Sequence, residues 1–200
     1  RFLEYTTLGI VGHPSDWLIS SGFDKEAIFD KLGINLQYIP MEELLDEYSS
    51  LKDEVAESWK EVVSCHSERA CHSERACHSE RSEESPSPIP PSVKQAIPGA
   101  YRLYKALKTI VADYGLSGLT IRCFDLLTAV HNTGCLALAR LNSEGYVAGC
   151  EGDVPAMISM MIGRAVTGVS GFQANPSSID PESGEVVFAH CTVPLDTGRI

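Results

Sequence analysis

The sequence has no apolar run long enough to cross a membrane, and no charged-then-apolar signal segment opens it. It also lacks an excess of basic residues, because 16 Lys and Arg stand against 27 Asp and Glu, a net charge of −11. An acidic chain without a basic stripe is a poor match for nucleic acid. We therefore expect neither a membrane nor a nucleic acid as a partner.

A secreted disulfide framework is also missing. The seven cysteines are odd in number and their spacings match no such framework, so we expect reduced thiols in a cytoplasmic protein. With 44% hydrophobic residues among 200, the chain can form one or two compact domains with a core. It begins at Arg1 rather than Met and stops at Ile200 directly after "LDTG", which leads us to expect a fragment.

A six-residue repeat, "CHSERACHSERACHSER", begins at Cys65 and runs into the Ser/Pro-rich "SEESPSPIPPS". Known metal signatures pair two ligands, loop away and pair two more, and they have apolar residues around the metal. The repeat has neither feature, and its composition cannot form a core. We predict that residues 64–92 are a disordered insertion. The alternative is a metal-binding protein that uses the repeat.

Outside the repeat, strand-like and helix-like segments alternate. Helical spacing of apolar residues occurs on both sides of residues 64–92, with Pro98 predicted at the start of the second helix and Gly115 at its end. Asp24 is predicted to cap an earlier helix that stops at Gly33. The predicted strands are 7–12, 34–40, 119–124, 146–150, 171–175 and 185–194, and the predicted helices are 23–33, 41–63, 93–115, 134–145 and 154–168.

This alternation predicts an α/β fold with a doubly wound, Rossmann-like parallel sheet. We expect residues 1–63 and 93–150 to form that domain. Residues 151–200 are predicted to begin a mixed α/β C-terminal domain. Ligands of such sheets bind beyond the carboxyl ends of the strands, so the segments that follow the predicted strands are the candidates for a site.

The first of these segments contains Ser15, Asp16 and Trp17 in "GHPSDWLISS". It lacks the glycine spacing of a phosphate-binding loop. The three residues are candidates for contacts with a substrate. Equally, Ser15 or Asp16 can cap a short helix and Trp17 can belong to the core.

Carboxylates follow two further predicted strands. Asp125 lies in "RCFDLL", and Glu151 and Asp153 lie in "GCEGDVPAM". Divalent cations such as Mg²⁺ and Mn²⁺ prefer carboxylate oxygens, so three acids converging from neighbouring strands would suit one. The structural alternative for Asp153 is to cap the helix that starts at Val154.

The segments "TTLGIVGHPSDWLI", "GLTIRCFDLL", "TGCLALARLNSEGYVAGCEGDVPAMISMMI" and "FQANPSSID…GEVVFAHCTVP" resemble the L-fucose isomerase-like proteins, in particular the L-fucose/L-arabinose isomerase family. "GCEGDVPA" and "AHCTVP" are the most specific blocks. The resemblance covers nearly the whole chain except residues 64–92, which the family pattern lacks.

The resemblance implies a cytoplasmic, Mn²⁺-dependent aldose–ketose isomerase that acts on a small sugar through an ene-diol, with active sites between the subunits of a homo-oligomer. Asp125 matches the first of the family's two metal-binding acids, although Glu is commoner there, and Glu151 or Asp153 matches the second. The same three acids are the candidates for catalysis.

The family's late histidine ligand would lie beyond Ile200 and its first α/β domain before Arg1, so we expect residues 1–200 alone to be inactive. His190, within a predicted strand, is expected to be structural or to contact the ligands from behind, and not to be that missing ligand. The alternative function is a non-catalytic sugar-binding or regulatory module on the same fold.

Overall fold

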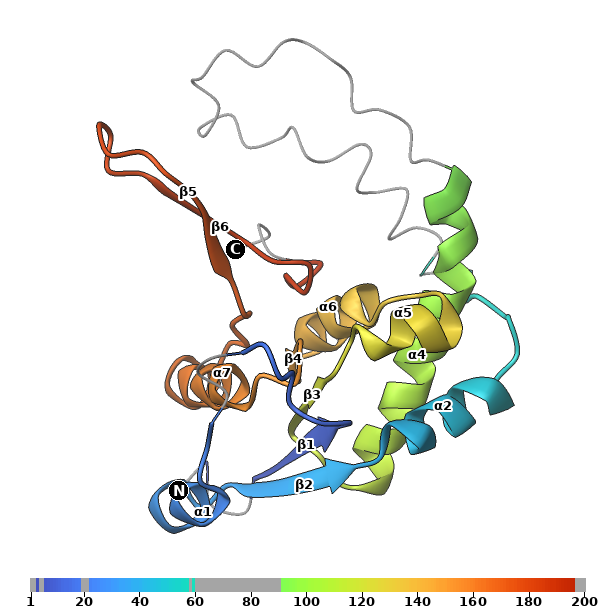
Figure 1. The fold of residues 1–200 in the computed structure, drawn as a ribbon, viewed down its shortest axis with the longest axis horizontal. Coiled ribbons are helices and arrows are strands. Elements are labelled where there is room, and N and C mark those ends of the chain that lie inside the picture. The colour runs from blue at the N-terminus through green and yellow to red at the C-terminus, as the bar shows by residue number, and fades with distance from the viewer. Residues whose placement is uncertain (1–2, 4–5, 19–21, 58, 60–90, 197–200) are drawn as a thin grey trace.

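The structure, a computed structural model, describes residues 3, 6–18, 22–57, 59 and 91–196. Four parallel strands form its central sheet in the order β2-β1-β3-β4 (Figure 1). Their bounds are Thr7–Val11 for β1, Asn35–Ile39 for β2, Gly118–Ile121 for β3 and Val147–Gly149 for β4. The predicted α/β fold with a parallel, Rossmann-like sheet is thereby confirmed.

Helices cover both faces of this sheet (Figure 1). One face packs against α1 (Lys25–Leu32) and α7 (Val154–Thr167). The other packs against α2 (Met41–Ser50), α4 (Pro91–Asp113) and α6 (Cys135–Ser143). The short α5 (Asp125–Val130) directly follows β3.

The strand sequences explain why both faces are covered. In β1, Leu8 and Ile10 belong to the apolar cluster beneath α1 and α7, whereas Val11 belongs to the cluster on the opposite face. Successive side chains of a strand point to opposite faces, so a strand that is apolar at nearly every position must be buried on both. All three of these side chains are fully buried.

The order of the strands creates a switch point between β1 and β3. From β1 the chain crosses to β2 on one side, and it then returns to place β3 on the other side of β1. Crossovers that leave in opposite directions open a crevice beyond the carboxyl ends of the two central strands, where ligands of such sheets bind. The segments that follow β1 and β3 flank this crevice.

Two predicted helices have different limits in the structure. The helix predicted over 41–63 is wrong over residues 51–56, because α2 ends at Ser50, where Leu51 is extended and the hydroxyls of Ser49 and Ser50 bond carbonyls of the last turns of α2. Residues 57 and 59 are helical as predicted, and residues 58 and 60–63 lie outside the described residues. Pro98 lies inside α4 and does not begin it. Pro98 therefore has no N–H to donate within the helix, a cost that the packing of the following turns outweighs.

The predicted insertion, residues 64–92, lies outside the described residues except at its end. Residues 91–92 belong to α4, so the predicted boundary is wrong there. The division into domains stays a prediction. The helix α7, which we assigned to the second domain, packs on the parallel sheet through Val154, Met157 and Met161.

Two further strands, β5 (Asn175–Ile179) and β6 (Val186–Ala189), form a separate antiparallel hairpin that projects away from the sheet (Figure 1). The strand predicted over 171–175 is wrong except for Asn175. The preceding segment runs beside β4, where the side chain of Gln173, and not a ladder of backbone bonds, accepts from the N–H of Cys150 at 3.0 Å. The strand predicted over 185–194 ends at Ala189.

Candidate active site at the switch point

Arg122, the first residue after β3, joins the segments on both sides of the switch point. Its Nε lies 3.2 Å from Asp125 Oδ1, and its Nη2 lies 3.3 Å from Asp16 Oδ2. Its Nη1 donates to the carbonyl of Pro14 at 3.2 Å. The segment after β1 is therefore tied to the start of α5 by one guanidinium. The hydrogen bond to Asp16 and the charge of Asp125 raise the pKa of Arg122, so it stays protonated.

Sequence reasoning missed Arg122. The available signal was a charged residue directly after the apolar run "LTI" at the carboxyl end of a predicted strand. We predicted Asp16 and Asp125 as site residues, but not the arginine that is bonded to both of them.

Trp17 and Phe124 form an exposed aromatic pair beside Arg122. Their ring centroids are 5.5 Å apart in an edge-to-face arrangement, and the Arg122 guanidinium lies 5.5 Å from the Trp17 ring centroid. Trp17 is 52% exposed and Phe124 is 48% exposed. Trp17 therefore lies on the surface and does not belong to the core, which was its alternative position. Two apolar rings next to charged groups provide a surface for an amphipathic ligand.

A groove of about 400 Å³ opens beyond the ends of β1 and β2. Arg122 and Asp125 form part of its wall, opposite residues that follow β2. Its volume is within the range of about 300–1,000 Å³ that is usual for small-molecule sites. The described residues that line it are Gly12, His13, Tyr38, Ile39, Pro40, Met41, Glu42, Arg122 and Asp125.

The segment after β4 packs against the segment after β1. The N–H of Ser15 donates to the carbonyl of Glu151 at 3.1 Å, and Gly152 donates to the carbonyl of Ile121 at 2.9 Å. A Cβ at Gly152, where φ is +68°, would lie 2.8 Å from the carbonyl oxygen of His13, so glycine is required. Glu151 has a φ of 63°, a conformation that costs a residue other than glycine about 1–3 kcal/mol.

Ser15 is buried, and its hydroxyl has no hydrogen-bond partner among the described residues. Buried hydroxyls nearly always have a partner, so this one is available to a buried water, but Ser15 is not among the residues that line the groove. The hydroxyl of Ser15 caps no helix here. Asp153, in contrast, caps α7, because its Oδ1 accepts from the N–H of Ala156 at 2.9 Å. Asp153 therefore has the structural role that was the alternative to metal binding, the capping of a helix.

The three acids predicted as metal ligands, Asp125, Glu151 and Asp153, do not gather into one group. Among the described residues, carboxylate oxygens from these three do not all lie within 4.8 Å of one another. One oxygen of Asp125 faces Arg122, and one oxygen of Asp153 serves as the cap. The donor type suits a hard cation, but these residues alone do not fit one.

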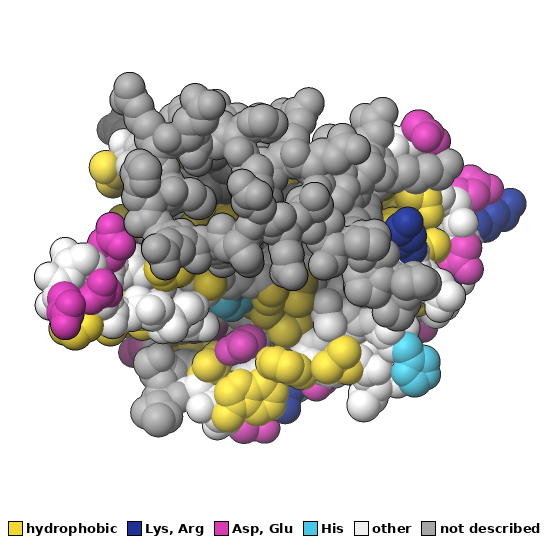
Figure 2. Space-filling view, turned by 90° about the horizontal axis from the view of Figure 1, so that it is seen from above, with side chains coloured by type: hydrophobic (Ala, Val, Ile, Leu, Met, Phe, Trp, Pro, Cys, Tyr) yellow, Lys and Arg dark blue, Asp and Glu magenta, His cyan; other side chains and the backbone are white. Residues whose placement is uncertain are grey.

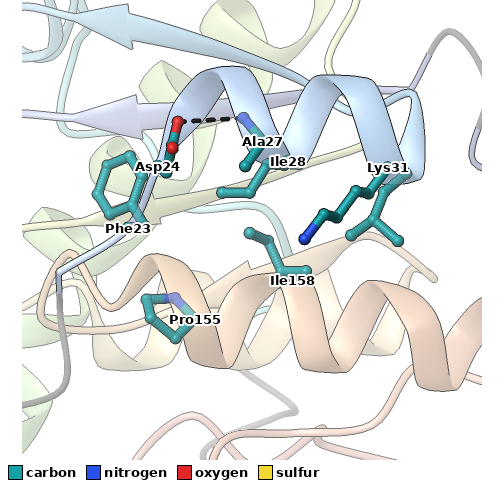
Figure 3. A pocket seen from close by; sticks show the side chains of 8 residues that line it. Phe23, Asp24, Ala27, Ile28, Lys31, Pro155 and Ile158 are labelled. Carbon is teal, nitrogen blue, oxygen red and sulfur yellow. Dashed lines mark hydrogen bonds between the residues drawn. The ribbon is translucent and has the colours of Figure 1, made fainter.

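A second pocket, of about 430 Å³, lies between α1 and α7, away from these segments (Figure 3). Asp24, one of its two charged residues, already caps α1 by accepting from the N–H of Ala27 at 3.0 Å. Its other lining residues are mostly apolar: Phe23, Ala27, Ile28, Lys31, Leu32, Pro155 and Ile158. It offers few polar groups to orient a polyhydroxylated ligand, so the groove at the switch point is the better candidate.

Acidic residues outnumber basic residues in the sequence, 27 against 16. In the view of Figure 2, acidic side chains are scattered over the described residues, and the basic side chains there do not form a continuous stripe. Of the helices that the structure describes, none combines the length and the apolar character needed to cross a membrane.

No family model matches the chain. Among proteins of known name, it is similar to a sulfoquinovose isomerase of Clostridium sp. (strain MSTE9), with 28% identity over 191 residues. The similarity covers 94% of this chain and 38% of that protein. The chain thus spans less than half the length of the relative that it matches.

Proposed function

We propose that this chain is part of an aldose–ketose sugar isomerase and that the groove at the switch point binds the sugar. The similarity to a sulfoquinovose isomerase along 94% of the chain carries this proposal. The position of the groove at the carboxyl ends of β1 and β2 supports it, because that is where parallel sheets bind ligands.

The side chains around the groove suit a sugar. The exposed rings of Trp17 and Phe124 offer apolar surface for the C–H face of a pyranose or an open chain. The carboxylate of Asp125, which lines the groove, and that of Asp16 offer hydrogen-bonding groups for sugar hydroxyls. Arg122 orients both carboxylates.

Aldose–ketose isomerisation moves a proton between neighbouring carbons through an ene-diol, and it needs a base close to the substrate. Asp125 and Glu151 are the proposed candidates, because Asp153 is already engaged as a helix cap. The family resemblance implies that Mn²⁺ or another divalent cation polarises the carbonyl when bound. Since the acids of this chain do not complete a cation site, we assign the proton transfer to side chains alone.

The identity of the sugar is the finer part of the proposal. Sulfoquinovose carries a sulfonate, which needs an available cation. Among the described residues that line the groove, Arg122 is the single Lys or Arg, and it already faces Asp16 and Asp125. This pairing favours an uncharged sugar of the L-fucose or L-arabinose type.

We further propose that the parent protein is a homo-oligomer. The hairpin supports this, because Ile179, Val187 and Phe188 are 66%, 56% and 59% exposed. Apolar side chains that project from a domain in this way are usually covered by another part of the protein or by a partner. Light scattering of the parent protein measures its oligomeric state.

The test of the enzyme proposal uses the parent protein encoded by the complete gene. Purified protein is incubated with L-fucose, L-arabinose, D-arabinose and sulfoquinovose in deuterated water, with and without Mn²⁺, and NMR follows ketose formation and deuterium incorporation. We expect turnover of at least one sugar, and its loss in Asp125→Asn or Glu151→Gln but not in the surface control Glu26→Gln. If none of the four sugars is converted and none exchanges deuterium, the proposed isomerase function is refuted.

A non-catalytic sugar-binding module is the second candidate. The dispersed carboxylates and the pairing of Asp125 with Arg122 favour it. Calorimetry separates the two functions, because a binding module would bind a sugar equally well with EDTA present and would show no exchange. Residues 1–200 alone are proposed to be inactive in either case.

A further inference from the structure

Four cysteines from separate parts of the chain meet beside β4. Cys123 follows β3, Cys135 begins α6, Cys150 follows β4, and Cys191 lies two residues beyond β6. The Sγ atoms of Cys123 and Cys150 are 2.9 Å apart. The Sγ atom of Cys191 lies within 4.8 Å of that of Cys150, and Cys135 lies near Cys191. All the cysteines of the described residues belong to this thiol cluster.

His190 belongs to the same place. Its Nδ1 lies 3.8 Å from Cys191 Sγ and 2.9 Å from the hydroxyl of Thr192. Coordination of a metal by Nδ1 would replace its hydrogen bond with Thr192. The ligand atoms of Cys150, His190 and Cys191 all lie within 4.8 Å of one another. Contrary to our prediction, His190 is not within a strand, because β6 ends at Ala189.

Specific hydrogen bonds hold the segment around Cys191 against the sheet. The buried carboxamide of Asn142 donates to the carbonyl of Thr192 at 3.1 Å, and the N–H of Leu195 donates to the hydroxyl of Ser143 at 2.7 Å. Gln173 accepts from the N–H of Cys150 at 3.0 Å. The side chains of Cys150 and Cys191 are therefore brought together by contacts that do not involve sulfur.

We propose that Cys150, Cys191 and His190 form a three-ligand binding site for a thiophilic divalent cation such as Zn²⁺, with the fourth tetrahedral position left to water. Thiolate and imidazole are the ligands that Zn²⁺ takes in tetrahedral sites, whereas Mg²⁺ and Mn²⁺ prefer oxygen. This site is separate in chemistry from the carboxylates at the switch point, and it does not depend on the proposed sugar isomerase.

The distances agree with this geometry. With Zn–S near 2.3 Å and Zn–N near 2.0–2.1 Å, tetrahedral angles place a sulfur and a nitrogen ligand about 3.6 Å apart. The observed separation of Cys191 Sγ and His190 Nδ1 is 3.8 Å. Two sulfur ligands would be about 3.8 Å apart, so Cys123, at 2.9 Å from Cys150, is too close to share the ion. It is placed instead to hydrogen-bond to the Cys150 sulfur.

The three ligands come from two parts of the fold, because His190 and Cys191 follow β6 whereas Cys150 follows β4. A bound cation would fasten the base of the β5–β6 hairpin to β4, next to Glu151.

The test titrates the reduced, metal-free 200-residue chain with Co²⁺ and then with Zn²⁺. Tetrahedral thiolate coordination gives a sulfur-to-cobalt charge-transfer band that Zn²⁺ abolishes, and we expect one such site per chain. Cys191→Ser should weaken Zn²⁺ binding by more than the ~10–100-fold that is typical for loss of an outer hydrogen-bond partner. Cys123→Ser should weaken Zn²⁺ binding only by a factor within that range.

The repeat supplies the matched control, because it also contains cysteines and histidines. The triple variant Cys65→Ser, Cys71→Ser, Cys77→Ser should keep the band and the Zn²⁺ affinity. Circular dichroism checks that each variant is folded. If Cys191→Ser does not fold, His190→Gln tests the site in its place. A band that persists unchanged in Cys191→Ser and His190→Gln, or that disappears in the triple variant, would overturn the proposal.

Discussion

The carboxamide of Asn142 pairs with both backbone polar groups of Ala148. Its Oδ1 accepts from the N–H at 2.8 Å, and its Nδ2 donates to the carbonyl at 2.9 Å. Ala148 lies on β4, the edge strand of the parallel sheet, where neither group has a further strand to bond. A side chain of α6 therefore completes the edge of the sheet, and the same Nδ2 bonds the segment that carries Cys191.

Asn142→Ala should lower the free energy of unfolding by about 2–4 kcal/mol, because it leaves buried backbone groups of Ala148 and Thr192 unpaired. Urea unfolding followed by circular dichroism measures this. Asn35→Ala, at an exposed position on β2, is the control and should change stability by less than about 0.5 kcal/mol. Equal effects of the two substitutions would show that the carboxamide of Asn142 does not support the sheet.

Arg122→Gln should release the segment after β1 while leaving the core intact, since the carboxylates it contacts are largely solvent-exposed. We expect little change in melting temperature but increased acrylamide quenching of Trp17, whose ring lies beside the guanidinium. Trp59 is 3% exposed and should contribute a constant background. In the parent protein, the same variant should weaken sugar binding. Unchanged quenching and binding would contradict the role assigned to Arg122.

Asp153→Ser and Asp153→Ala separate capping from chemistry at this position. Serine can cap α7 as aspartate does, so Asp153→Ser should retain stability, whereas Asp153→Ala should lose about 1 kcal/mol. If Asp153 only caps the helix, Asp153→Ser keeps isomerase activity in the parent protein. An inactive Asp153→Ser variant with native stability would instead place Asp153 among the ligands or the catalytic acids.

Tyr104 should titrate unusually late. Burial and the hydrogen bond to Glu144 at 2.7 Å raise its pKa from 10.0 to about 12. Because the folded pKa lies above the unfolded one, this contribution to stability is complete below about pH 10 and is lost as the pH rises towards 12. An absorbance titration compared with Tyr104→Phe isolates the residue. Glu144→Gln should move its pKa back towards 10, and an unshifted titration would contradict this.

Glu144 should show the opposite dependence at acid pH. Burial tends to raise its pKa, but hydrogen bonds from Tyr104, Lys108 and Arg140 outweigh burial and lower it. Its contribution to stability is therefore present above its unfolded pKa and lost as the pH falls through the folded one. At acid pH, the free energy of unfolding of Glu144→Gln should therefore depend less on pH than that of Glu182→Gln, a control at an exposed position.

The fold could be read from the sequence because its signals are local. The apolar run of β1 needs cover on both faces, and Asp24 and Gly33 mark the ends of α1 by their own side-chain and backbone chemistry. These effects act within a few residues, so the parallel α/β sheet was predictable. Where two local signals competed, as at Ser49 and Ser50 or at Pro98, the predicted limits of the helices were wrong.

The candidate site was only partly predictable, for the same reason. The sequence by itself determined that Ser15, Asp125 and Glu151 follow strands and hence lie at one edge of the sheet. Only the tertiary structure decided that Arg122 bonds residues from two segments, that Asp153 is used as a cap and that Cys150 meets Cys191 and His190. Those contacts join residues up to 108 positions apart, and no local pattern records which partners the order of the strands brings together.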